Sequence, residues 1–419
     1  MGGFAGSHHS TVLRLEERGE ARLVCTCDPQ AAFFLPQQNQ WKFSKRGVRV
    51  FEDYRTMLES CHRDLDLVII PTPIQLHAEM HAAAAAFGLP SYLEKPATLD
   101  YAELERMIAD DSRLPKASFV GFNFIIEKPR RRLKERILAG EFGAVQGATL
   151  VARWPRPTSY FLRNQWAGRL MIDGRCVLDS CLGNALAHFV HNLLFWAGHG
   201  DVFSWAQLAT VQAELYRAHR IEGADTFFVE ADTTSGIKLR FALSHACAGV
   251  SSQAEVVICE RATIRYVVAN QAEIRWNDGR VERIVLEPFD GLEENHLEYY
   301  RYLCDESPRP TTTLADSHSF VALNDLAYVS SGTVTTIPRE RITELRNAKE
   351  QQDYFEVAGL AAAQENFATR GTWPAEQEWG RGTGEVVTLK DLPRFHDVVR
   401  AMAGVQQAVA DAPSTSPTG

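Results

Sequence analysis

The tetrapeptide Leu93-Glu94-Lys95-Pro96 contains the lysine of this sequence that is best placed for chemistry. It directly follows Ser91 and Tyr92, which begin a segment that we predict to be a β-strand. In open α/β sheets, ligands bind beyond the carboxyl ends of parallel strands, so a lysine at this point would face a bound ligand. A partly desolvated ammonium beside another cation has a lowered pKa and can exchange a proton with a hydroxyl group. The alternative is a solvated lysine in a surface turn.

A glycine-rich segment opens the chain. Gly2-Gly3-Phe4-Ala5-Gly6 fits the last five positions of the G-x-G-x-x-G pattern, with Met1 in the place of the first glycine. Glycines permit a tight turn and let backbone N–H groups approach a pyrophosphate at a helix N-terminus. Asp28 lies 22 residues beyond Gly6, at the end of a predicted strand over residues 21–27, where a carboxylate accepts hydrogen bonds from an adenosine ribose and repels a 2′-phosphate. The pattern predicts a dinucleotide site that prefers NAD to NADP. A glycine turn followed by a strand-end aspartate is the alternative.

A strand is missing before this glycine loop. A dinucleotide-binding unit places its first strand immediately before the loop, in the centre of the sheet. The sequence starts at Met1 and leaves no residues for that strand. We therefore expect an earlier translation start, which would add several residues that form an apolar strand ending in glycine.

A second group of polar residues lies in the segment 179–188. Asn184 and His188 are four residues apart on a helix predicted over residues 182–196, so they share one helical face. Asn184 could orient a substrate hydroxyl while His188 takes its proton. The neighbours of His188 are apolar, so a core histidine is the alternative. Asp179 fits a site residue and a turn or cap residue equally well.

Aromatic and polar residues just before this segment are candidates for a substrate pocket. Aromatic rings stack on the faces of sugars, and arginine or asparagine side chains bind hydroxyls or a carboxylate. The alternative is a surface loop with one buried tryptophan. The candidates are Tyr160, Arg163, Asn164 and Trp166, with His245 as a weaker addition from the end of a later strand.

Short predicted strands and helices alternate up to about residue 123, which is typical of a parallel sheet that helices cover on both faces. From residue 124 to about 345, long strand-like runs dominate, interrupted by predicted helices at 127–139, 182–196, 291–303 and 317–331. We therefore predict an α/β protein with two domains. A Rossmann domain over 1–123, doubly wound but without its first strand, precedes an α+β domain over 124–345 with a large, mostly antiparallel sheet. Residues 346–419 are predicted to be a C-terminal extension with a disordered end.

Composition excludes several classes of function. The 419 residues carry a net charge of −9 and contain no stripe of lysine and arginine, which argues against nucleic-acid binding. No apolar run approaches the ~20 residues that span a bilayer, and no export signal is present, so we expect a cytoplasmic protein with no membrane partner. The eight scattered cysteines form no C-x-x-C pair, which predicts reduced thiols and no metal site. The second domain offers helices for only one face of its sheet, so we expect a homodimer or homotetramer to cover the other face.

Several of these motifs occur together in one known family. Glu94-Lys95-Pro96, the segment GGFAGSHH at the start and Gly121-Phe122-Asn123 resemble the Gfo/Idh/MocA oxidoreductases, which include glucose-fructose oxidoreductase and inositol dehydrogenase. The resemblance implies an NAD(P)-dependent enzyme that transfers a hydride between a nicotinamide and a secondary alcohol of a sugar, sugar acid or cyclitol. It places Lys95 beside the nicotinamide and the substrate. It also implies cofactor contacts from Thr72, Pro73, His77, Glu94, Lys95 and Asn123 in addition to the glycine loop and Asp28.

The sequence departs from that family at the second catalytic motif. The family carries an aspartate and a histidine four residues apart, whereas Gly183 stands four residues after Asp179 and Asn184 stands four residues before His188. The segment is similar to a subgroup with N-x-x-x-H. We therefore assign catalytic roles to Lys95, His188, Asp179 and Asn184. Two alternative functions stay open: a redox-assisted NAD-dependent glycosidase on the same fold, and a non-catalytic dinucleotide-binding sensor or repressor.

Overall fold

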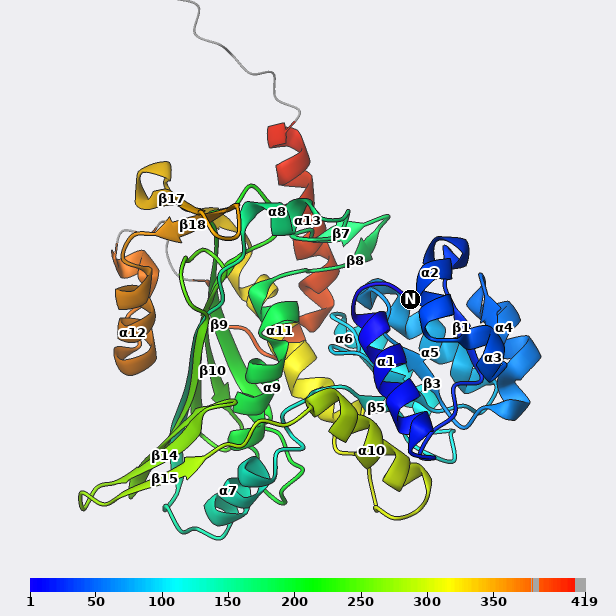
Figure 1. Cartoon of the computed structure of the whole chain (residues 1–419). Coiled ribbons are helices and arrows are strands. Elements are labelled where there is room, and N and C mark those ends of the chain that lie inside the picture. The colour runs from blue at the N-terminus through cyan, green and yellow to red at the C-terminus, as the bar shows by residue number, and fades with distance from the viewer. Residues whose placement is uncertain (378, 380–383, 411–419) are drawn as a thin grey trace, which may run out of the picture. The chain divides into compact units, whose positions relative to one another are not determined.

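The computed structural model describes residues 1–377, 379 and 384–410, and contacts within the chain divide it into two compact units, which are described separately (Figure 1). Unit 1 comprises Met1–Thr98, Ala102–Ile126 and Phe289–Ser317, and unit 2 comprises Leu99–Tyr101, Glu127–Pro288 and the chain from His318 onward. The first boundary lies close to the predicted one. The segment 289–317, which we predicted in the second domain, belongs to unit 1 in this division. The predicted disordered end over residues 411–419 lies outside the described residues.

Unit 1 is built on short parallel strands. Strand β1 (Cys25–Cys27) pairs with β2 (Arg49–Phe51), and β4 (Ser91–Leu93) pairs with β3 (Val68–Ile70) on one side and β5 (Phe119–Val120) on the other. All of these pairings are parallel, which confirms the predicted Rossmann-like architecture. Among the described residues no hydrogen-bonded strand joins β1 to β3, so the parallel strands form two separate sheets.

Helices follow the strands of unit 1 in the alternation that the sequence predicts. Helix α1 buries Val12 and Leu15, and Asp53 caps α4 by accepting a 2.8 Å hydrogen bond from the backbone N–H of Thr56. Capping of this kind satisfies a donor that the first helical turn leaves unpaired. The helices are α1 (Phe4–Glu17), α2 (Leu35–Gln40), α3 (Phe43–Arg46), α4 (Tyr54–Cys61), α5 (His77–Ala86), α6 (Tyr101–Asp111) and α10 (Gly291–Leu303).

Unit 2 contains a nine-stranded sheet in the order β15-β14-β13-β12-β6-β11-β10-β9-β16 (Figure 1). Its pairings are antiparallel except for β6 with β11 and β9 with β16, which agrees with the predicted large and mostly antiparallel sheet. The strands are β6 (Val145–Arg153), β9 (Leu208–Arg217), β10 (Thr226–Thr233), β11 (Lys238–Ser244), β12 (Ser252–Cys259), β13 (Ala262–Val267), β14 (Gln271–Trp276), β15 (Val281–Val285) and β16 (Thr335–Thr336).

Helices lie on both faces of this sheet, which corrects the premise that helices were available for only one face. Helices α9 (Ala187–Trp196) and α11 (His318–Ser331) pack on one face, and α12 (Leu360–Arg370) lies on the opposite side of the sheet (Figure 1). Phe367 of α12 packs on Phe228 and Ala242 in one buried cluster. Side chains on β12 and β15 remain exposed, including Ile258 and Val285. The face that an oligomer would cover is therefore narrower than expected.

A buried ion pair fixes α9 against the sheet. Arg130 of α7 (Lys128–Leu138) is fully buried, and its Nη1 lies 2.6 Å from Oε2 of Glu255 on β12. The same carboxylate accepts hydrogen bonds from Asn192 Nδ2 at 2.8 Å and Trp196 Nε1 at 2.6 Å, both on α9. Burying one of these charges without its partner would cost roughly several kcal/mol in the free energy of folding. Each charged group therefore depends on its partners.

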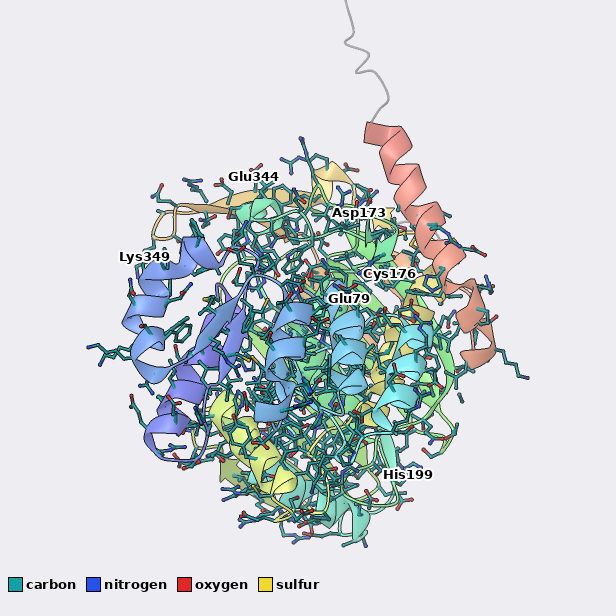
Figure 2. All side chains as sticks on the ribbon, turned by 90° about the vertical axis from the view of Figure 1, so that its right-hand side faces the viewer. Glu79, Asp173, Cys176, His199, Glu344 and Lys349 are labelled. Carbon is teal, nitrogen blue, oxygen red and sulfur yellow. The ribbon has the colours of Figure 1, made fainter. Side chains whose placement is uncertain are left out.

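The remaining short elements are peripheral to the large sheet. Strands β17 (Ile342–Asn347) and β18 (Gln352–Val357) form a hairpin that carries Glu344 on its first strand and Lys349 in its turn (Figure 2). Strands β7 (Met171–Ile172) and β8 (Arg175–Cys176) form a second, smaller hairpin. Helix α13 (Phe395–Ala410) ends the described chain. In the part of the chain that the structure describes, no helix is both long and apolar enough to cross a membrane.

Candidate functional site

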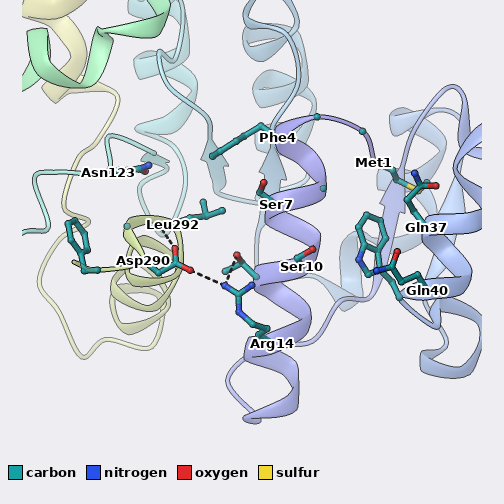
Figure 3. Close-up of a pocket in the computed structure, with 17 residues that line it drawn as sticks. Met1, Phe4, Ser7, Ser10, Arg14, Gln37, Gln40, Asn123, Asp290 and Leu292 are labelled. Carbon is teal, nitrogen blue, oxygen red and sulfur yellow. Dashed lines mark hydrogen bonds and ion pairs between the residues drawn. The ribbon is translucent and has the colours of Figure 1, made fainter. Parts of the chain in front are cut away.

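A groove of about 750 Å³ in unit 1 contains the glycine loop. Helix α1 passes between Asn123 and Asp290 on one side and Gln37 and Gln40 on the other (Figure 3). Of the predicted cofactor residues, Gly2, Gly3, Phe4, Gly6 and Asn123 line the groove, whereas Ala5, Asp28, Thr72, Pro73, His77, Glu94 and Lys95 are not part of its lining.

The backbone of the loop leaves little room for side chains at its three glycines. Gly3 has a φ of 55°, in the left-handed region that other residues seldom adopt. A Cβ atom on Gly2 would lie 2.9 Å from the ring of Phe34, and one on Gly6 would lie 3.2 Å from the carbonyl oxygen of Met1. Helix α1 begins at Phe4, so unpaired backbone N–H groups and the positive end of the helix dipole meet the groove at this point.

Asp28 stands at the carboxyl end of β1, as the sequence predicts. Its Oδ1 accepts a hydrogen bond from the backbone N–H of Gln30 at 2.9 Å, and its Oδ2 pairs with the ammonium group of Met1. Met1 lines the groove, so the Asp28 carboxylate lies next to the glycine loop without lining the groove itself. The role of Asp28 as a ribose contact stays a prediction.

The Glu94-Lys95 turn follows the carboxyl end of β4 and is held by a chain of buried side chains. Lys95 is half-buried, and its backbone N–H donates to Oε2 of Glu94 at 3.4 Å. The Glu94 Oε1 lies 2.9 Å from His8 Nε2, and His8 Nδ1 lies 3.0 Å from His296 Nε2. His296 Nδ1 in turn lies 3.0 Å from the hydroxyl of Tyr300. These hydrogen-bonded side chains connect the Glu94-Lys95 turn to α1 and to α10.

His77, predicted as a cofactor contact, is a buried connector between two loops. Its Nε2 lies 2.8 Å from the carbonyl oxygen of Thr72, and its Nδ1 lies 3.1 Å from that of Pro96. Burial lowers the pKa of His77. The neutral imidazole has one N–H, so it donates to one of these carbonyl groups at a time while the ring lies between the Thr72-Pro73 loop after β3 and the turn that contains Lys95. This geometry supports a role in positioning Lys95.

In unit 2, a one-turn π-helix (Cys181–Ala185) precedes α9, so the predicted helix over 182–196 is interrupted. Asn184 lies in this turn, and its Nδ2 donates to Asp179 Oδ1 at 2.8 Å. The other carboxylate oxygen of Asp179 accepts a hydrogen bond from the backbone N–H of Gly168 at 2.9 Å. Asp179 is buried, and Asn184 and His188 are partly exposed. The structure thus places Asp179 as the residue that positions Asn184.

Three aromatic rings and two arginines alternate beside these residues. We call Trp154, Arg156, Tyr160, Arg163 and Trp166 the arginine–aromatic ladder. The Arg156 Cζ lies 5.5 Å from the centroid of the Trp154 ring and 4.6 Å from that of Tyr160. The Arg163 Cζ lies 3.8 Å from the centroid of Tyr160 and 5.1 Å from that of Trp166.

Two other pocket candidates have local structural roles. Asn164 Oδ1 accepts hydrogen bonds from the backbone N–H groups of Trp166 and Ala167, at 3.1 and 2.8 Å, and so closes a turn. His245 is buried, and its Nδ1 lies 2.7 Å from the carbonyl oxygen of Trp154. Burial, with a smaller contribution from the charge of Arg156, lowers the pKa of His245 to about 3. Asn164 and His245 each hold a backbone segment beside the ladder in place.

Sequence reasoning missed five of the residues that build these two clusters: Trp154, Arg156, His8, His296 and Tyr300. Trp154 and Arg156 follow β6 with a spacing of two, and this alternation was the available signal for side chains on one face. His8 lies inside the glycine-loop segment that the sequence singled out, but no pattern connected it with His296 in a segment remote in the chain.

The comparisons with known proteins agree with the geometry of unit 1. Residues 1–122 match the family model GFO_IDH_MocA, described as an oxidoreductase family with an NAD-binding Rossmann fold. The likeness to this family by sequence model therefore covers residues 1–122, the part of the chain that contains the glycine loop and the Lys95 turn. An inositol 2-dehydrogenase from Leifsonia xyli is 35% identical over 27% of this chain, and a myo-inositol 2-dehydrogenase from Thermotoga maritima is 27% identical over 27% of it. The matched stretch spans 34% of each of these relatives, about a third of their length.

Comparison with solved structures extends the likeness in fold to most of the chain. A levoglucosan dehydrogenase in complex with NADH has a TM-score of 0.66 at 15% identity and covers 79% of this chain and 95% of its own. The WlbA dehydrogenase from Bordetella pertussis, in complex with NADH and UDP-GlcNAcA, has a TM-score of 0.64 at 21% identity. The match covers 79% of this chain and 93% of the WlbA chain. At these identities the comparison shows a shared fold for both units.

Proposed function

We propose that this chain is an NAD-dependent oxidoreductase that transfers a hydride between the nicotinamide and a secondary alcohol of a polyhydroxylated substrate. The substrate class is that of sugars, sugar acids and cyclitols. The observation that carries the proposal is the Glu94-Lys95 turn at the carboxyl end of β4, in the same unit as a glycine loop at a helix N-terminus. The named relatives and neighbours of the Gfo/Idh/MocA family support the same reaction class.

In this proposal the cofactor supplies the hydride acceptor, and the chain supplies binding and proton transfer. The glycine loop and the N-terminus of α1 bind the pyrophosphate, and Asp28 binds the adenosine ribose and disfavours a 2′-phosphate. Lys95 and His188 exchange the proton of the substrate hydroxyl. Asn184, oriented by Asp179, binds a hydroxyl group of the substrate.

The test of this function is a direct search for redox turnover. NADH binding should be detected by its fluorescence, and sugars, sugar acids and cyclitols should be screened with NAD for absorbance near 340 nm. The proposal predicts net NADH formation with at least one free polyol. Dinucleotide binding together with cleavage of a glycoside and no net NADH would instead support a glycosidase. Dinucleotide binding with no turnover of any class would support a sensor.

A further inference from the structure

The arginine–aromatic ladder places two positive charges beside one aromatic ring of the candidate substrate site. Trp154 and Arg156 follow the carboxyl end of β6. Tyr160 lies in α8 (Thr158–Leu162), and Arg163 is the C-cap of that helix. The two guanidinium groups lie beside the same tyrosine ring. The face of an aromatic ring stabilises a guanidinium group that lies over it. The N–H groups at the edge of that guanidinium stay available to a planar anion.

Among the residues that the structure describes, neither arginine pairs with a carboxylate. Within residues 1–377, 379 and 384–410, Arg156 and Arg163 form no ion pair with a carboxylate, whereas Arg169 in the same segment pairs with Glu222 at 3.3 Å. The Nε of Arg156 is buried and has no hydrogen-bond partner among these residues. Two like charges beside one ring repel each other, and a buried N–H without a partner is costly. A bound anion would relieve both costs.

The ladder lies close to the segment of unit 2 that contains His188. The ring of Trp154 packs edge-on against Phe189, the residue after His188, with centroids 5.7 Å apart. Burial raises the pKa of Tyr160, and the charge of Asp179, which positions Asn184, adds to this effect. The ladder therefore contacts the residue next to His188, and its Tyr160 is close enough to Asp179 to feel the charge of that carboxylate.

We propose that Arg156 and Arg163 bind an anionic group of the substrate, a carboxylate or a phosphate. This inference rests on the proposed function, because it names the class of polyol that the site selects. Stacking holds both guanidinium groups in place before the substrate arrives, so little side-chain freedom is lost on binding. A neutral sugar or cyclitol would leave two adjacent positive charges uncompensated.

The first experiment measures binding to the cofactor-free chain by calorimetry. The probes are gluconate and glucuronate for the carboxylate arm, glucose 6-phosphate for the phosphate arm, and glucose and myo-inositol as neutral counterparts. We expect an anionic probe of one arm to bind at least about tenfold more tightly than the neutral probes. Arg156→Met and Arg163→Met, which keep an apolar stem, should each weaken that binding about 10- to 100-fold, since hydrogen bonds to a charged group are worth about 1.5–3 kcal/mol.

The matched control is Arg169→Met, which removes a guanidinium from the same segment and should change anion binding less than twofold. Turnover adds a second readout: both ladder variants should raise KM for the anionic substrate more than they lower kcat. Equal or tighter binding of the neutral probes, or anion binding that is insensitive to both ladder variants, would overturn the inference, and so would a failure of every anionic probe to bind. Failure of NADH binding would contradict the proposed function instead, and the anion measurement would still decide the role of the arginines.

Discussion

His8 Nε2 lies 2.9 Å from Glu94 Oε1, so the helix that follows the glycine loop directly contacts the residue next to Lys95. One assignment of protons satisfies each hydrogen bond between Tyr300, His296, His8 and Glu94. Tyr300 donates to His296 Nδ1, His296 Nε2–H donates to His8 Nδ1, and His8 Nε2–H donates to Glu94. Burial lowers the pKa of His296, which agrees with the neutral imidazole that this assignment requires.

Replacing His8 should therefore destabilise unit 1 in a way that depends on hydrogen bonding. His8→Ala removes the partner of Glu94 Oε1 and that of His296 Nε2 in a buried place, and we expect a loss of about 3 kcal/mol in the free energy of unfolding. His8→Gln can still donate and accept, so its loss should be about 1 kcal/mol. Urea denaturation measures both. His199→Ala, at an exposed position, is the control (Figure 2). Equal losses for the two His8 variants would contradict the relay of hydrogen bonds.

Acidification should weaken the fold because several histidines are buried in neutral form. Burial lowers the pKa of His9 to about 4 and that of His245 to about 3. Between these values and about 6.5, the unfolded chain binds more protons than the folded chain, so the free energy of unfolding falls as pH falls. Each such histidine contributes at most about 1.4 kcal/mol per pH unit.

This prediction is checked by urea unfolding at about pH 7, 6 and 5. His9→Gln removes one of the titrating groups and should reduce the slope. Identical slopes for wild type and His9→Gln would show that the His9 imidazole is protonated in the folded chain as readily as in the unfolded one.

Asp28→Ala should relax the choice between the two nicotinamide dinucleotides. The carboxylate stands beside Met1 of the groove, where it would accept hydrogen bonds from a ribose and repel a 2′-phosphate. We expect NADH affinity to fall about 10- to 100-fold and NADPH affinity to rise or stay level. Fluorescence titration measures both constants, with Asp66→Ala as an exposed control in the same unit. An unchanged ratio of the two affinities would exclude Asp28 as the selecting residue.

The sequence predicted those elements whose pattern is local. The strand over 91–93 and the helix over 291–303 have the predicted bounds in the structure, because an apolar run and an amphipathic period are contained in each segment. The same holds for the position of Asp28 at a strand end. The Lys95 turn could be located because it follows a recognisable strand.

Features that depend on distant segments could not be predicted in this way. His8 and His296 are 288 residues apart, and they meet only because the segment 289–317 returns to unit 1. The π-helical turn before α9 brings Gly183 so close to other backbone that a Cβ atom there would lie 3.0 Å from the carbonyl oxygen of Leu178. A helical period read from sequence is blind to such a contact.

A homo-oligomer through the exposed strands of the large sheet stays a prediction. Ile258 on β12 is aligned through β13 and β14 with Val281 on β15, and both are exposed, at 39% and 46%. Light scattering at micromolar concentration should give the mass of a dimer or tetramer, and Ile258→Asp should reduce it. Val250→Asp, at an exposed position in the loop after β11, should leave the mass unchanged. A monomeric wild-type chain would rule out this assembly.

The last prediction separates proton transfer from cofactor binding. Lys95 and His188 are proposed to act on the proton of the substrate hydroxyl, so each replacement should lower turnover far more than dinucleotide affinity. General acid–base assistance is typically worth about 10²–10⁴-fold, and Lys95→Ala and His188→Ala should each lose kcat on that order while their NADH dissociation constants change less than about threefold. Asn184→Ala should mainly raise KM, because its amide binds a hydroxyl and transfers no proton. Added primary amines should restore part of the turnover of Lys95→Ala, which a purely structural lysine would not allow. Lys45→Ala and His199→Ala, both exposed, are the matched controls. If His188→Ala keeps near-native kcat, the proton must pass to another group, and Asp179 would be the next residue to replace.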